Sequence, residues 1–126
     1  MAREAKVPGP DHPITVTPSS DHVVVRVGDR VVADTTRALV LQESTYPAVR
    51  YIPIDDVDQS QLTRTDTTTY CPFKGDASYY TITGGEGLID SVWSYEQPYA
   101  AVEEIAGHVA FYPNKVETTI TRDERA

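Results

Sequence analysis

"VVVRVGDRVVAD", residues 23–34, is the stretch that indicates the fold most directly. Valines lie on both sides of Gly28-Asp29, and β-branched side chains favour strands. A glycine at the first of two central positions suits a type II′ turn, whose twist matches that of the flanking strands. We therefore predict a β-hairpin with strands at 23–27 and 30–34.

The segments around this hairpin also indicate short strands. Apolar and polar residues alternate loosely between turn-forming glycines and prolines, as is typical of antiparallel sheets. Further strands are predicted at 38–43, 49–52, 65–70, 77–83, 88–95 and 108–112. A helical turn is expected at 55–62, and alanines ahead of Gly107 favour a helix at 99–106. The predicted fold is a single domain, mainly antiparallel β, with one or two short helices.

The two ends of the chain differ from this middle part. Residues 1–12 are rich in proline and predict a flexible N-terminal arm. Residues 13–116 are predicted to form the domain. Residues 117–126 are mostly threonine and charged groups and predict a C-terminal tail. The total of 126 residues fits one domain of common size.

Composition excludes several classes of partner. The net charge of -8 opposes binding to nucleic acid, because phosphate contacts need clustered lysine and arginine. No apolar run approaches the about 18 residues of a membrane span, and the start lacks the apolar core of a signal peptide. A single cysteine permits no internal disulfide. We expect a cytoplasmic protein with a reduced thiol.

The sequence CPFKG, residues 71–75, holds that cysteine and is the first candidate for a site. Lys74 follows Cys71 by three residues, and a nearby ammonium group lowers the pKa of a thiol. Cys71 is therefore a candidate nucleophile, or part of a pocket wall beside a cation. A small buried cysteine in a turn, with Lys74 in solvent, explains the same residues.

Aromatic residues supply candidate pocket walls, because tyrosine joins an apolar ring to a polar tip. Trp93 and Tyr95 share one face of a predicted strand, whereas Tyr79 and Tyr80 point to opposite faces. Glu43 ends an apolar strand and needs a cation if it points inward; Lys74 or Arg50 could supply it. The predicted ligand-binding residues are Glu43, Cys71, Lys74, Tyr79, Trp93 and Tyr95.

Two further motifs carry weaker signals. Asp56 and Asp58 could hold Mg²⁺ for nucleotidyl transfer, but no glycine-rich phosphate loop accompanies them, and helix capping explains acidic residues there. Residues 84–87, GGEG, lack the lysine of a phosphate-binding loop and are predicted to form a hairpin loop. We expect no metal and no cofactor.

A series of phrases across the chain is similar to the bacterial family called domain of unknown function 427. The phrases are HPITVTPS, VVADTTRALVLQES, RYIPIDDV, TYCPFKGDASYY and WSYEQPYAAVEEIAGHVAFY, between about residues 12 and 116. The resemblance implies an all-β fold like the β-tent, or barrel-like, with a ligand-sized pocket. Members of the family have carried a nucleotidyltransferase label. Many β-tent proteins hold zinc with paired CxxC motifs, which one cysteine cannot provide.

These observations lead to one preferred hypothesis and two alternatives. The preferred one is a small-molecule-binding domain whose pocket is lined by the CPFKG loop and aromatic residues. The first alternative is an enzyme that uses Cys71 as a nucleophile, or a carboxylate-assisted transferase. The second is a protein-interaction module, since exposed strand edges can pair with another chain or with a second copy in a homodimer. The sequence identifies neither the ligand nor the pathway.

Overall fold

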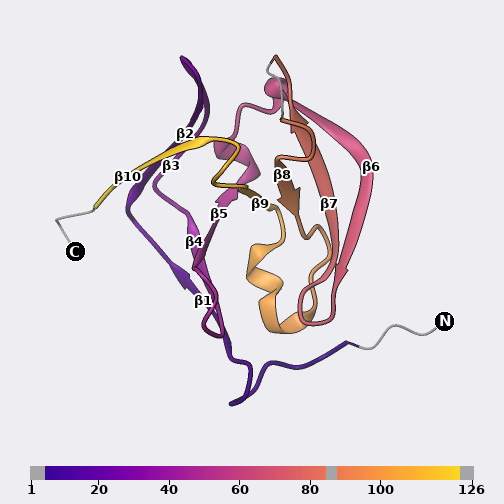
Figure 1. Cartoon of the computed structure of the whole chain (residues 1–126). Coiled ribbons are helices and arrows are strands. Elements are labelled where there is room, and N and C mark those ends of the chain that lie inside the picture. The colour runs from indigo at the N-terminus through magenta and orange to yellow at the C-terminus, as the bar shows by residue number, and fades with distance from the viewer. Residues whose placement is uncertain (1–4, 85–87, 123–126) are drawn as a thin grey trace.

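The computed structural model describes residues 5–84 and 88–122, and strands dominate it (Figure 1). The strands are β1 (Ile14–Pro18), β2 (His22–Val27), β3 (Arg30–Thr35), β4 (Leu39–Glu43), β5 (Val49–Pro53), β6 (Leu62–Cys71), β7 (Gly75–Ile82), β8 (Val92–Ser94), β9 (His108–Phe111) and β10 (Glu117–Thr121). Three short 3-10 helices are η1 (Ile54–Asp56), η2 (Gln59–Gln61) and η3 (Ala100–Ile105). The predicted mainly β class is confirmed.

The strands form two antiparallel sheets. The larger has seven strands in the order β1-β4-β5-β9-β8-β7-β6, and the smaller has three in the order β10-β2-β3. Both sheets are open, and neither closes into a barrel. In Figure 1 the arm of β1, β4 and β5 faces the arm of β6, β7 and β8, with η3 between them.

The β2–β3 hairpin forms as predicted. Val27 pairs with Arg30 across the two-residue turn, and Gly28 has a φ of 58°. That left-handed conformation is the reason for a glycine at this position. Val23 and Val32 are completely buried, so the hairpin presents an apolar face to the larger sheet.

Two apolar cores follow from the alternation of side chains along the strands. Tyr51 and Ile52 are neighbours on β5 and therefore point to opposite faces of the sheet. Ile52 joins the inter-sheet core, in which β2 and β3 pack against the larger sheet. Tyr51 joins the inner core, in which Val102 and Ile105 of η3 pack between the two arms of the larger sheet. Strand β5 therefore separates the two cores.

The predicted helix at 99–106 forms as a 3-10 helix and not as an α-helix. The segment forms 3-10 turns over Ala100–Ile105, interrupted by non-helical dihedral angles at Val102. Six residues are too few to stabilise an α-helix by alanine propensity alone. The buried side chains of Val102 and Ile105 instead determine the local path.

The chain ends contribute more structure than we expected. Residues 117–121, expected to be tail, form β10 and pair with β2. Within the expected N-terminal arm, the backbone N–H of Lys6 donates to the Pro72 carbonyl at 2.7 Å. In the predicted 84–87 loop, residues 85–87 lie outside the described residues. Across 5–84 and 88–122, no helix has the length and apolar character that crossing a bilayer requires.

Ile82 provides a test of the inter-sheet core. Its side chain is fully buried there, whereas Ile89 is 75% exposed. We expect Ile82→Ala to lower the free energy of unfolding by about 2–5 kcal/mol, because it leaves a cavity. The control Ile89→Ala should change it by less than about 0.5 kcal/mol. Urea denaturation measures both, and equal effects would contradict the assigned core.

Candidate functional site

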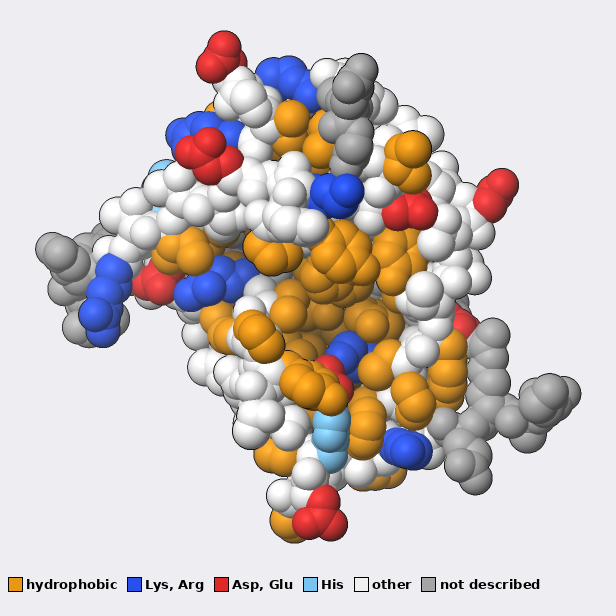
Figure 2. All heavy atoms as spheres, viewed as in Figure 1, with side chains coloured by type: hydrophobic (Ala, Val, Ile, Leu, Met, Phe, Trp, Pro, Cys, Tyr) orange, Lys and Arg blue, Asp and Glu red, His pale blue; other side chains and the backbone are white. Residues whose placement is uncertain are grey.

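A cavity of about 390 Å³ opens between the two arms of the larger sheet, and we call it the central cavity. Strands β4 and β5 line one side, and β7 and β8 line the other. Figure 2 shows hydrophobic side chains gathered around a hollow in this face. The lining residues are Leu41, Glu43, Tyr46, Pro47, Val49, Tyr51, Lys74, Tyr79, Trp93, Tyr95 and Tyr112.

The turn between β6 and β7 holds Lys74 in place. Cys71 pairs with Gly75, and the Lys74 N–H donates to the Cys71 carbonyl at 3.2 Å. Gly75 has a φ of 108°, and a β-carbon there would lie 3.5 Å from the carbonyl oxygen of Gln97. The Tyr99 N–H donates to the Lys74 carbonyl at 3.0 Å. The turn is thus held from both sides, and Lys74 is only 8% exposed.

Both carboxylate oxygens of Glu43 have hydrogen-bond partners. The Lys74 ammonium donates to Oε1, and His12 Nε2 hydrogen bonds to Oε2 at 2.8 Å. The His12 ring stacks on Phe73, with 4.2 Å between ring centroids. Burial raises the pKa of Glu43, but hydrogen bonds and charge from Lys74 and His12 outweigh burial and hold it below its usual value. Glu43 is therefore ionised at neutral pH.

Several tyrosines line the same cavity as this ion pair. Trp93 Nε1 donates to the Tyr51 hydroxyl at 3.2 Å, and Tyr79 hydrogen bonds to Thr69 at 2.9 Å. Burial raises the pKa of Tyr51 and of Tyr95, and burial with hydrogen bonding to Tyr79 raises that of Tyr112 to about 12. Tyr51, Tyr95 and Tyr112 are therefore protonated at neutral pH and can donate hydrogen bonds.

Two polar groups of the cavity have unused donors. The Lys74 ammonium carries three N–H donors; among the described residues it hydrogen bonds only to Glu43. It lies 5.8 Å from the centroid of the Tyr95 ring. No described residue hydrogen bonds to the Tyr95 hydroxyl. These donors remain available to an acceptor inside the cavity.

The structure brings most of the predicted site residues together. Glu43, Lys74, Tyr79, Trp93 and Tyr95 all line the central cavity, and Glu43 takes Lys74 as its cation. Side chains along β7 alternate as expected, because Tyr80 packs against the inter-sheet core on the other face.

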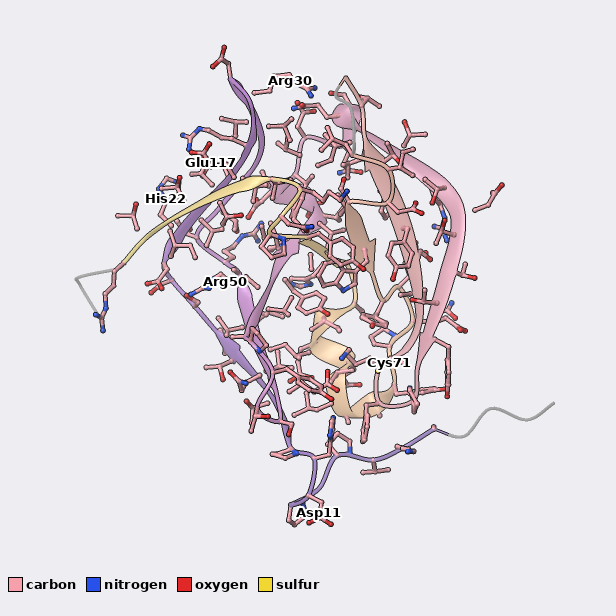
Figure 3. The ribbon with its side chains drawn as sticks, in the orientation of Figure 1. Asp11, His22, Arg30, Arg50, Cys71 and Glu117 are labelled. Carbon is pink, nitrogen blue, oxygen red and sulfur yellow. The ribbon has the colours of Figure 1, made fainter. Side chains whose placement is uncertain are left out.

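Cys71 occupies a different position. It does not line the central cavity; it is half-buried and packs against the inner core. Figure 3 shows it where β6 ends, beside η3.

His12 and Tyr51 are functional candidates that the sequence analysis did not select. His12 is 31 residues from Glu43 in the chain, within a segment that we expected to be a flexible arm. No spacing pattern connects two residues so far apart. Tyr51 could have been found from its alternation with Ile52, because it lies on the same strand face as Val49.

The acidic residues after β5 have structural partners. Asp56 accepts hydrogen bonds from Thr35 at 2.7 Å and from Arg37 at 3.0 Å. Asp58 accepts from the Ser60 N–H and caps η2, the role that we predicted for this stretch. In the part of the chain that the structure describes, no three His, Cys, Asp or Glu side chains gather as metal ligands.

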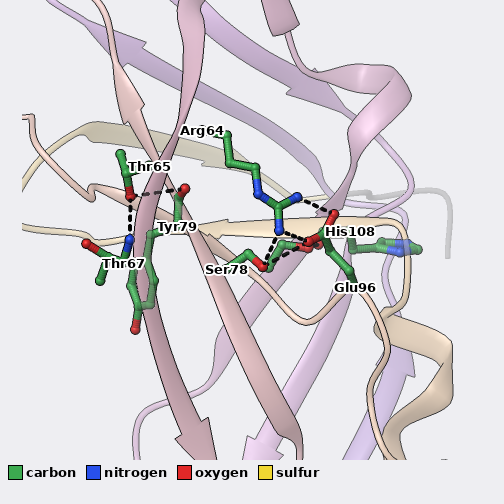
Figure 4. A network of polar contacts seen from close by, with 8 residues as sticks. Arg64, Thr65, Thr67, Ser78, Tyr79, Glu96 and His108 are labelled. Carbon is green, nitrogen blue, oxygen red and sulfur yellow. Dashed lines mark hydrogen bonds and ion pairs between the residues drawn. The ribbon is translucent and has the colours of Figure 1, made fainter.

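A second polar network lies on the surface of β6 and β7 (Figure 4). Arg64 donates to Glu96 and to Ser78, each at 2.9 Å, and Ser78 donates to Glu96 at 2.8 Å. Arg64 and Glu96 are largely exposed, and such pairs contribute little to stability. Because these groups bind one another at the surface, we assign the network a structural role.

Replacing Lys74 tests the buried ion pair. We expect Lys74→Met to lower the free energy of unfolding by about 3 kcal/mol near neutral pH, because it leaves Glu43 buried with one fewer partner. The pKa of Glu43 is lowered by folding, so its stabilisation exists above its unfolded pKa of about 4.3 and is lost as the pH falls through the folded value. The difference between the two proteins should shrink from about pH 6 to about pH 3.5.

Urea denaturation at both pH values measures that difference. Lys115→Met is the matched control, because Lys115 is exposed and its ammonium has no ion pair within the described residues. It should change the free energy of unfolding by less than about 0.5 kcal/mol at either pH. A Lys74→Met effect that stays constant with pH would contradict the assigned pairing.

Comparison with known proteins identifies the family of this chain. No curated protein matches the chain significantly. A family model described as a domain of unknown function, DUF427, and labelled NTP_transf_9 matches residues 15–122. That range includes all residues that line the central cavity, whereas His12 precedes it. The chain belongs to the DUF427 family of domains of unknown function.

Proposed function

We propose that this protein binds a small molecule in the central cavity, with an oxygen acceptor of the ligand placed at Lys74. The observation that carries the proposal is the buried Lys74 ammonium, which lines the cavity with donors that no described residue accepts. A buried donor without an acceptor is unfavourable by about 1–3 kcal/mol, and more for a charged group. A ligand oxygen would remove that penalty.

The cavity walls indicate what else the ligand contains. Trp93 and Tyr112 lie with 4.5 Å between ring centroids, and Tyr51 meets Trp93 edge to face at 6.3 Å. Such walls favour a flat, partly apolar body. The volume of about 390 Å³ falls at the small end of ligand pockets, which span roughly 300–1,000 Å³.

The charges of Lys74 and Glu43 further restrict the class of ligand. Glu43 already neutralises Lys74, so a strongly anionic ligand gains little and a second carboxylate would approach Glu43 at a cost. The donors of Lys74, Tyr51 and Tyr95 suit a neutral carbonyl group. We therefore propose a neutral, flat molecule with one or more carbonyl oxygens.

Binding is the role that these contacts support, and we assign no reaction. Cys71 lies outside the cavity lining, and no described histidine hydrogen bonds to its thiol. A nucleophilic role for Cys71 therefore lacks the adjacent base that such a mechanism requires.

A fluorescence screen tests the proposal. Trp93 is the only tryptophan and lines the cavity, so neutral carbonyl compounds that bind there should change its emission. We expect Lys74→Met to weaken binding by about tenfold or more, since hydrogen bonds to charged groups contribute about 1.5–3 kcal/mol. Tyr95→Phe, which removes only the hydroxyl, should weaken it less.

Lys115→Met serves again as the matched control and should bind like the unmodified protein. Circular dichroism and urea denaturation show whether each variant is folded under the assay conditions. The proposal fails if no neutral carbonyl compound binds, or if a compound binds folded Lys74→Met as tightly as the unmodified chain.

A further inference from the structure

A second hollow lies between the two sheets, on the other face of β5, and we call it the inter-sheet groove. Its volume is about 260 Å³. Strands β2 and β10 supply one wall, and β5 with Phe111 of β9 supplies another. The lining residues are Val23, Val25, Pro47, Ala48, Val49, Arg50, Ile52, Trp93, Phe111, Pro113, Thr118 and Ile120.

Arg50 is the one charged residue in this lining. It follows Val49 on β5 and precedes Tyr51, so it points away from the central cavity, on the same face as Ile52. Figure 3 shows it beside β5. Its Nε atom is fully buried and has no hydrogen-bond partner.

Arg50 lacks the polar partners that three other arginines near the sheets have. Arg30 donates to Gln61 and to the Thr83 carbonyl, and Arg37 and Arg64 form ion pairs with acidic side chains. No ion pair or hydrogen bond joins the Arg50 guanidinium to any residue in 5–84 or 88–122. The Arg50 side chain is half-buried, and its buried Nε–H donor lacks an acceptor, which is unfavourable in an apolar groove.

We propose that the inter-sheet groove binds a small amphipathic carboxylate, with the carboxylate on Arg50 and the alkyl chain along the groove. A guanidinium presents paired N–H donors that match the two oxygens of a carboxylate. A single guanidinium balances one negative charge, which favours a monoanion over a phosphate dianion. The remaining lining, from Val23 to Ile120, is suited to methylene groups.

This site is separate from the one proposed for the central cavity. Pro47, Val49 and Trp93 line both hollows, but Lys74 and Glu43 belong only to the central cavity, and Arg50 belongs only to the groove. The charge of Lys74 is neutralised by Glu43, whereas that of Arg50 is not. An anionic head group therefore favours the groove.

Octanoate and 1-octanol, which share an eight-carbon chain, provide the test. Trp93 fluorescence and isothermal titration calorimetry should both detect octanoate binding to the intact chain. Arg50→Met keeps an apolar stem of similar length and should weaken octanoate binding by about tenfold or more. It should leave the weaker binding of 1-octanol unchanged. The free energy of unfolding of Arg50→Met should not fall, because no described residue pairs with the Arg50 guanidinium.

Two control variants separate the alternatives. Arg26→Met changes the net charge equally and lies on β2 next to Val25, but Arg26 does not line the groove, so octanoate binding should persist. Lys74→Met should also retain it. The proposal is overturned if octanoate does not bind, if folded Arg50→Met binds it like the unmodified chain, or if Lys74→Met abolishes binding. The last result would place octanoate in the central cavity.

Discussion

The ion pair between Lys74 and Glu43 is the interaction on which the arrangement of the site depends. It joins the end of β4 to the turn between β6 and β7, and so connects the two arms of the bent sheet. Removing two charges from water is unfavourable, and their attraction offsets this only with good geometry and further hydrogen bonds. His12 supplies one such bond, and the Tyr95 ring lies beside the ammonium. The pair therefore defines a polar end in an otherwise aromatic cavity.

The bend of the larger sheet explains why the Lys74–Glu43 pair faces the central cavity. Strands β4 and β5 meet η3 and β7 through Leu41, Tyr51 and Ala77, which pack in the inner core. The rings of Trp93 and Tyr112, with 4.5 Å between their centroids, line the cavity beside this core. On the opposite face, Ile52 and Val109 pack in the inter-sheet core, and the inter-sheet groove contains Arg50 among mostly apolar residues. The central cavity and the inter-sheet groove therefore lie on opposite faces of β5.

The sequence predicted those parts of the structure that depend on local signals. The β2–β3 hairpin follows from Gly28 and its flanking valines, and the shared face of Trp93 and Tyr95 follows from strand alternation. Glu43 could have paired with Lys74 or Arg50, and only the fold decides between them. Strand β10 was missed because its side chains are exposed and carry no apolar period; backbone pairing with β2 forms it. His12 was missed for a related reason, because its contact with Glu43 spans 31 residues.

Strand β5 gives the two hollows different electrostatic character. Tyr51 and Arg50 are adjacent on β5, so strand alternation alone sends a neutral donor to one face and a full positive charge to the other. In the central cavity, Glu43 sits within hydrogen-bond reach of the cation and lowers its attraction for anions. In the groove, no described acidic residue does so. Trp93 lines both hollows, so a ligand in either one contacts the same indole. The charge that the ligand meets differs, because the central cavity holds the Lys74–Glu43 pair and the groove holds Arg50.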